Sequence, residues 1–111
     1  MLMTDKALRK AVRLIEEFRK FDLEMQLQMV LIFLLIADNE GCTFVELIRE
    51  TGLRSSSVSR NVAALGQTHR KGLPGHDLVV AKEDPIDRRT KQIYLTQKGK
   101  LLVKAIKEII E

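Results

Sequence analysis

The stretch at residues 44–67 constrains this chain most, because it reads as two short helices around a tight turn. Thr43 and Glu46 form a capping box before the first helix, at residues 44–51. Gly52 supplies a left-handed stop at low cost, Leu53 is an apolar plug, and residues 55–57 are serines able to cap the next helix. This order is typical of a helix-turn-helix, here residues 44–69, whose second helix enters the DNA major groove.

The second helix separates on a helical wheel into an apolar face and an exposed face. Val58, Val62 and Leu65 form the expected core face, and Arg60 stands opposite among small residues. Small neighbours let the backbone approach the groove, where the planar fork of Arg60 can bind guanine O6 and N7. The stretch 54–71 has four Arg or Lys residues and no acidic residue. The predicted DNA-binding residues here are Arg54, Ser55, Ser56, Ser57, Ser59, Arg60 and Gln67.

The alternative for this helix is a solvated surface helix that happens to be rich in serine. Ser and Asn are mediocre helix formers with no structural reason to cluster here, which favours DNA contact. Composition permits a nucleic-acid partner without requiring one, since the net charge is +4.

Length and composition favour one domain that spans residues 1–111, with 45% hydrophobic residues. A single cysteine suits a reducing compartment, and the first ten residues lack the apolar run of a signal peptide. The longest apolar run, residues 29–37, is too short to span a bilayer. We therefore expect a cytoplasmic protein with no membrane association.

Three further helices are expected, at residues 4–21, 23–38 and 97–111. The second is apolar nearly all round and should lie at the centre of the core. The first and last have apolar surfaces that one small domain cannot fully cover, so they should form a homodimer interface. The predicted interface residues are Leu8, Val12, Ile15, Phe18, Leu102, Ile106, Ile109 and Ile110.

Two short β-branched or aromatic runs, at residues 78–82 and 92–95, read as strands joined by a charged loop. Two such strands directly after a helix-turn-helix form a β-ribbon wing at residues 78–95. The fold class expected is therefore mainly α with a small β-ribbon, a winged helix-turn-helix.

No catalytic, cofactor or metal site is expected from the sequence. His69 and His76 have no metal-ligand spacing around them, and Asp84 and Asp87 lie in a basic loop that supplies neutralising charges. Cys42 is best interpreted as a small buried hydrophobe, with a redox-sensing thiol as the alternative.

Three motifs occur in order: S-S-V-S-R at residues 56–60, D-P-x-D-R-R-x-K at residues 84–91 and L-T-x-K-G at residues 95–99. Together they resemble the MarR family of winged-helix transcriptional regulators over roughly residues 25–99. The resemblance implies a homodimer on a palindromic operator, with Arg60 and the serines in the major groove. It also implies that a wing arginine, Arg88 or Arg89, enters the minor groove beside Lys91, braced by Asp87.

Two departures from the family pattern change what to expect. The link between recognition helix and wing, residues 69–82, has several extra residues, which predicts an offset or more mobile wing. The chain also ends where the family often has one more dimerisation helix. The family usually binds a small-molecule effector. The sequence shows no polar residue placed for such a ligand, so it gives an effector no support.

The leading interpretation is a sequence-specific regulator of transcription that binds double-stranded DNA, acts as a repressor and is not an enzyme. One alternative is a winged helix used for protein assembly, although such a face more often carries aromatic residues or leucine. Another is a replication or partition initiator, which would share the DNA chemistry.

Overall fold

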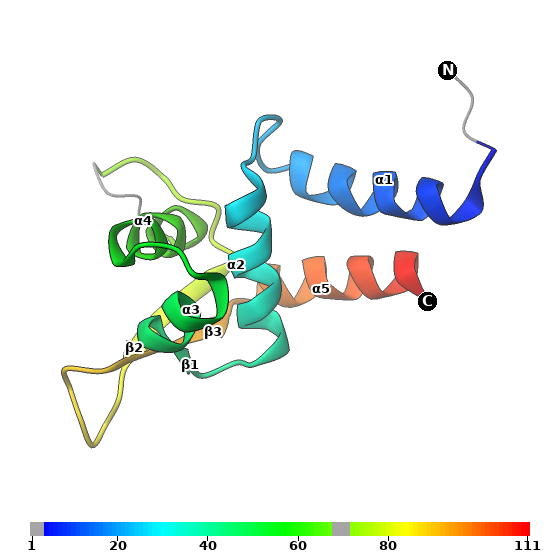
Figure 1. Ribbon diagram of the computed structural model, residues 1–111. Helices are drawn as coiled ribbons and strands as arrows, with labels where there is room; N and C mark the ends of the chain where they lie inside the picture. Colours follow the sequence, from blue (N-terminus) through cyan, green and yellow to red (C-terminus); the bar gives the residue numbers. More distant parts are fainter. Residues whose placement is uncertain (1–3, 68–71) are drawn as a thin grey trace.

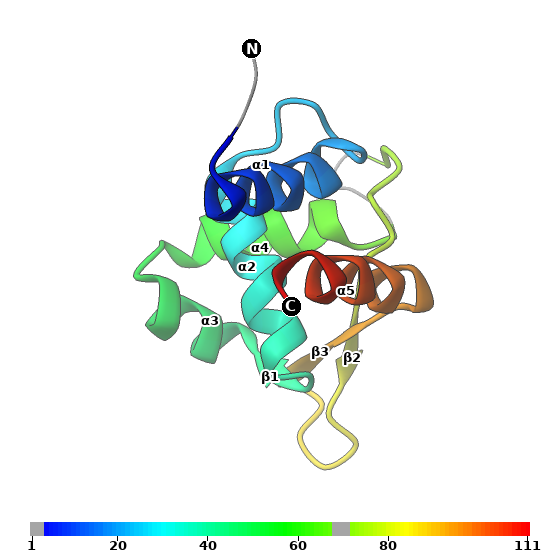
Figure 2. The same cartoon turned by 90° about the vertical axis from the view of Figure 1, so that its right-hand side faces the viewer.

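The structure is a computed structural model that describes residues 4–67 and 72–111. Helices dominate this part of the chain, and one small sheet lies at the edge of the molecule with its β-ribbon projecting outward (Figures 1 and 2). The elements in chain order are α1 (Lys6–Arg19), α2 (Leu27–Asp38), β1 (Cys42–Thr43), α3 (Phe44–Thr51), α4 (Ser55–Leu65), β2 (Val79–Glu83), β3 (Lys91–Leu95) and α5 (Gln97–Ile110).

Side-chain caps fix where three of the helices begin. Asp5 caps α1, because its carboxylate accepts hydrogen bonds from the amides of Ala7 and Leu8. The capping box is present at α3, where Thr43 Oγ1 accepts from the Glu46 amide and Glu46 accepts from the Thr43 amide. Thr96 caps α5 by accepting from the Gly99 amide at 3.0 Å. Each cap satisfies amides that a helix leaves without an internal partner.

Helix α2 runs through the centre of the core, as its sequence predicted. Ile32, Phe33 and Ile36 are fully buried, and the Phe33 ring meets the Phe18 ring edge-on with centroids 5.7 Å apart. The helix begins at Leu27 rather than at residue 23. The predicted start was wrong because Asp22 makes a local turn instead, with its carboxylate accepting the Glu24 amide at 2.9 Å.

The sheet has three antiparallel strands in the order β1-β3-β2, whereas the sequence predicted two. The extra strand, β1, pairs Cys42 with Ile93, and the Gly41 amide donates to the Ile93 carbonyl at 2.7 Å. A two-residue strand carries no alternating pattern, so only its tertiary partner reveals it. Its effect is to attach the start of α3 to the base of the wing.

Helices α1 and α5 lie side by side and project together from the rest of the molecule (Figures 1 and 2). Four residues predicted for the dimer interface are buried within the single chain instead: Phe18, Leu102, Ile106 and Ile109. They were misassigned because the two helices cover each other and the core covers their inner faces. The predicted interface residues that remain exposed are Leu8, Val12, Ile15 and Ile110.

None of the helices in residues 4–67 and 72–111 is long and apolar enough to cross a membrane.

Candidate nucleic-acid interface

The turn between α3 and α4 has the conformation that its sequence predicted. Gly52 adopts the left-handed region, with φ 70°, and its amide donates to the Ile48 carbonyl. Leu53 packs against the core, and its amide donates to Thr51 Oγ1 at 3.2 Å. The two helices are therefore joined as in a helix-turn-helix, with Leu47 buried on the inner side of α3.

Helix α4 presents the predicted faces. Val58 and Leu65 are completely buried and Val62 nearly so, while Arg60 is exposed. The remaining predicted recognition residues are exposed as well, apart from the half-buried Ser57. They are Arg54, Ser55, Ser56 and Ser59, together with Gln67, which was predicted on the recognition helix but lies beyond the end of α4 at Leu65. The structure therefore leaves this face of α4 accessible to a nucleic acid, with Arg60 as its central cation.

The start of α4 differs from the prediction that a serine would cap it. The capping position is Arg54, and no side chain accepts a hydrogen bond from the first amides of the helix. Because these amides lack an internal partner, they remain available to an anion such as a DNA phosphate. Ser55, Ser56 and Ser57 lie inside the first turn, with the first two exposed and Ser57 half-buried.

Asn61 was missed as a structural residue of α4. It is 8% exposed, and its side-chain amide donates to the Ser57 carbonyl at 2.8 Å. A polar side chain bonded back along its own helix is satisfied without a ligand. Its spacing from Val58 and Leu65 was the available signal, because all three fall on one helical stripe.

The link from α4 to β2 is bonded to the end of α4 over residues 75–78. The amides of His76 and Leu78 donate to the carbonyls of Ala64 and Leu65 at 2.9 and 2.8 Å. The Asp77 amide donates to the Gly66 carbonyl at 2.9 Å. These hydrogen bonds attach the entry to β2 to the end of α4, whereas an offset or more mobile wing stays a prediction. Residues 68–71, which end the acid-free stretch 54–71, lie outside the described residues.

The wing tip is built by two aspartates that accept backbone hydrogen bonds. Asp84 Oδ1 accepts from the Ile86 amide at 2.8 Å and from the Asp87 amide at 3.3 Å. Asp87 accepts from the Arg89 amide and the Thr90 hydroxyl, both at 3.1 Å. These bonds hold a tight loop whose closing contact is the Asp84 amide to the Thr90 carbonyl at 2.8 Å.

The cations of the wing point into solvent. Arg88, Arg89 and Lys91 are all exposed. The Arg89 side chain is 97% exposed and keeps an ion pair to Asp87, with Nε 3.8 Å from Oδ1. Asp87 therefore orients both the backbone and the side chain of Arg89. The wing projects at the end of the molecule remote from the free ends of α1 and α5 (Figure 1).

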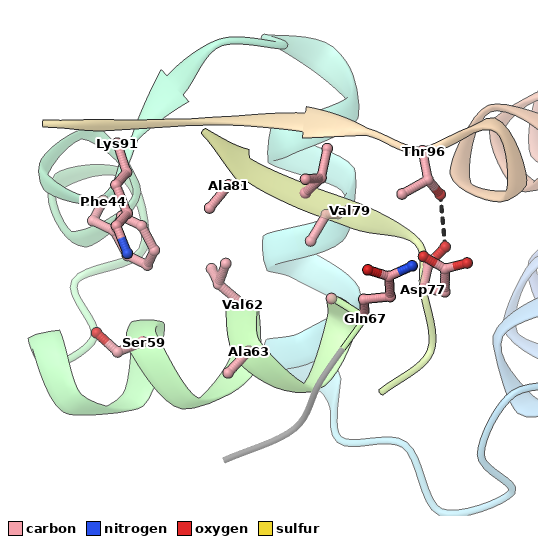
Figure 3. A pocket seen from close by; sticks show the side chains of 12 residues that line it. Phe44, Ser59, Val62, Ala63, Gln67, Asp77, Val79, Ala81, Lys91 and Thr96 are labelled. Carbon is pink, nitrogen blue, oxygen red and sulfur yellow. Dashed lines mark hydrogen bonds between the residues drawn. The ribbon is translucent and has the colours of Figure 1, made fainter. Parts of the chain in front are cut away.

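A cleft of about 610 Å³ separates α4 from the wing strands. Figure 3 shows Val62 of α4 facing Val79 and Ala81 of β2, with Phe44 and Lys91 at one end. At the other end Gln67 lies near Asp77, whose carbonyl accepts a hydrogen bond from the Thr96 hydroxyl at 2.6 Å. The floor is apolar and the polar groups stand at the ends.

Cys42 is 3% exposed, in agreement with its interpretation as a small buried hydrophobe. Burial raises the pKa of the Cys42 thiol, and the neighbouring Glu46 carboxylate raises it further, against a smaller lowering by a backbone hydrogen bond. A raised pKa disfavours the thiolate and so argues against a reactive thiol. Within the described residues, no three His, Cys, Asp or Glu side chains gather as metal ligands would.

These features define a winged helix-turn-helix: a turn-joined helix pair, an exposed second helix and a β-ribbon tied to its end. Among solved structures the chain is similar to the S. aureus MepR–DNA complex, with a TM-score of 0.70 and 20% identity over 95% of this chain and 76% of that one. It is similar to Streptococcus pneumoniae FabT in complex with DNA, with a TM-score of 0.65 and 20% identity over 92% and 68%.

A MarR transcriptional regulator from Methanosarcina mazei matches with a TM-score of 0.65 and 17% identity, over 95% of this chain and 68% of that one. No protein-family profile and no curated protein matches the chain. The fold is therefore the winged helix of MarR-like regulators, as the sequence motifs indicated.

Proposed function

We propose that this protein is a sequence-specific regulator of transcription that binds double-stranded DNA and acts as a repressor. One observation carries the proposal: the exposed face of α4 presents Arg60 among small side chains, and the wing tip carries the exposed Arg88 and Arg89. Two solved structures of the same fold, MepR and FabT, are described as complexes with DNA. Regulators of this shape place the helix in the major groove and use further elements on the backbone.

The residue roles follow from position and chemistry. Arg60 reads a base edge, because it is the long cation at the centre of the accessible face. Arg54 and Ser55, Ser56, Ser57 and Ser59 bind phosphates or the groove wall near the uncapped amides of α4, with Gln67 at the far end. In the wing, Arg89 enters the minor groove because Asp87 braces it, while Arg88 and Lys91 contact the backbone.

A homodimer is the proposed active form. Leu8, Val12 and Ile15 expose between 42% and 58% of their surfaces along one side of α1, and Ile110 exposes 56% on the adjacent α5. A contiguous apolar surface of this kind marks an interface. A two-fold axis through it would set two recognition helices about 34–36 Å apart, which matches half-sites one DNA turn apart.

The test is selection of bound duplexes from a random-sequence pool, followed by binding at several salt concentrations. We expect a palindromic consensus, and a steep fall in affinity as salt rises, because phosphate contacts release counterions. Binding with no consensus and a shallow salt dependence would favour a protein-assembly role instead. Selected sites that cluster at a replication origin rather than at promoters would favour an initiator.

A small-molecule effector has one supporting observation, the cleft between α4 and β2. Its volume of about 610 Å³ lies in the range of ligand sites, and anything bound there would touch both DNA-reading elements. Aromatic and aliphatic acids are suitable probes because Lys91 stands at one end. A probe that raises the melting temperature of the protein should then weaken operator binding, and one that leaves operator binding unchanged argues against an effector role for the cleft.

A further inference from the structure

Ile86 stands out at the tip of the wing because it is 97% exposed. Leu27, the next most exposed large apolar residue in the described part of the chain, exposes 79%. Single surface hydrophobics are common and need no explanation by themselves. Ile86 differs because it occupies the outermost loop of the element proposed to enter a DNA groove, between Asp84 and the arginine pair.

The turn itself does not require an isoleucine. Asp84 contacts Ile86 through the backbone amide of Ile86, so any residue with a backbone amide would make the same contact. β-branched residues are not turn formers, and the position has no core to pack against. An apolar side chain here therefore has no structural reason within this chain.

The loop holds Ile86 in place before any partner arrives. Asp84 accepts hydrogen bonds from two backbone amides, and the ring of Pro85 fixes the φ of that residue. Asp87 accepts hydrogen bonds from the Arg89 amide and the Thr90 hydroxyl. A preorganised tip loses little conformational entropy on binding. The same bonds occupy the two carboxylates nearest the tip, while Arg88 and Arg89 present exposed cations on its flank.

We propose that Ile86 is an apolar wedge that enters the minor groove and partly unstacks one base step in each half-site. This rests on the proposed function, since the wing must first reach DNA. Isoleucine and proline are among the side chains that proteins insert between bases from the minor groove, at a cost offset by the bend that follows. Pyrimidine–purine steps unstack most easily, so the wedge selects such a step without any hydrogen bond to a base.

The test compares Ile86→Asn, Ile86→Leu and native protein on a duplex that the native protein selected from a random pool. A fluorescent adenine analogue, placed in each pyrimidine–purine step in turn, brightens when its base unstacks. We expect native protein and Ile86→Leu to brighten one step per half-site. Ile86→Asn should remove the signal and bind about tenfold more weakly, because it keeps the amide but replaces the apolar wedge with a polar group.

Leu73→Asn is the matched control, because Leu73 is also exposed, at 57%, but lies in the link before β2. It should behave as native protein. Ile86→Asn with native affinity and an undiminished signal at saturating protein overturns the wedge, as does native binding with no brightening at any step. A native protein that selects no duplex at all would overturn the proposed function itself, so the two failures are distinguishable.

Discussion

At the scale of single residues, the proposed interface depends on which charged side chains are exposed and which make hydrogen bonds within the chain. Arg60 projects from the exposed face of α4 among small neighbours, and it makes no hydrogen bond to residues 4–67 or 72–111 that would fix its direction. Asp87 does the opposite, because its two oxygens organise the wing loop around Arg89 and Thr90. In the proposed complex, Arg60 would therefore read DNA and Asp87 would position Arg89.

Arg60→Ala should cost about 1–3 kcal/mol of binding free energy at the selected operator and relax specificity at one base pair per half-site. The reason is loss of a bidentate contact to a base edge. The measurement is a titration of operator and random duplex at one salt concentration. Lys107→Ala, which removes a cation from the exposed side of α5, is the control. Equal losses on both duplexes would make Arg60 a phosphate contact.

Asp87→Ala should weaken operator binding although it removes a negative charge, because the loop loses bonds to Arg89 and Thr90. Glu108→Ala removes the same charge from α5 and should leave affinity unchanged or slightly higher. Anisotropy titrations of both variants measure the difference. Tighter binding by Asp87→Ala would show that Asp87 opposes DNA rather than bracing the wing.

Cys42 gives a prediction for alkaline pH. Its pKa is raised in the folded state by burial and by Glu46, so the protonated thiol is favoured on folding. This contribution to stability is present below the unfolded pKa and is lost as pH rises through the folded pKa. In denaturant unfolding above about pH 8.5, the free energy of unfolding of the unmutated protein should fall more steeply with pH than that of Cys42→Ala. Parallel curves for the two proteins would contradict it.

At the scale of elements, one junction binds the recognition helix, the wing and α5 together. The Leu78 amide donates to the last turn of α4, and the Leu78 carbonyl accepts from the Thr96 amide at 3.1 Å. Gly99 in the first turn of α5 lies against that same carbonyl, where a Cβ atom would collide with it. The L-T-x-K-G motif therefore has a physical basis: threonine caps α5, and glycine lets it approach the wing.

Gly99→Ala should reduce the free energy of unfolding by roughly 1–3 kcal/mol, because the methyl group forces backbone atoms apart. Gly52→Ala is the contrasting variant, since its added Cβ meets nothing within 4 Å. Its cost is the left-handed backbone alone, about 1–2 kcal/mol. Gly99→Ala should in addition weaken operator binding under conditions in which the variant is fully folded, because it displaces β2 from α4. A stable variant with native affinity would contradict this account of the junction.

At the scale of the whole molecule, the proposed DNA-reading elements and the proposed dimer face lie at opposite ends. The molecule measures 51 Å along its long axis and 28 Å across, with α1 and α5 forming the end remote from the wing. Residues on the inner sides of these helices hold the chain together, and residues on their outer sides are exposed. The fold and the proposed dimer would therefore depend on different side chains.

Ile15→Glu should abolish the dimer and keep the fold, because Ile15 is 49% exposed and a charge there meets water in the monomer. Ile106→Glu should unfold the protein instead, because Ile106 is 4% exposed in the core. Sedimentation at micromolar concentration and circular dichroism distinguish the two. We expect Ile15→Glu to lose most operator affinity as well, since each half-site is then bound alone. A native monomer that binds one half-site with full affinity would contradict the dimer proposal.

The sequence determined what depends on neighbours along the chain. The Thr43–Glu46 capping box, the left-handed Gly52, the buried stripe of α4 and the central position of α2 all follow from local spacing, since caps and helical periodicity act within a turn or two. The wing was predictable as two strands around a charged loop because both runs are β-branched. The exposed face of α4 followed from the same wheel.

Tertiary structure alone decided what depends on partners distant in sequence. Strand β1 exists because Cys42 meets Ile93, and the link before β2 is fixed because its amides find the carbonyls of α4. Likewise, the apolar surfaces of α1 and α5 divide into core and exposed sides only when the two helices meet. Ile106 and Ile110 have the same chemistry, so composition cannot separate them. Burial does, because it is a property of the packed molecule rather than of the residue.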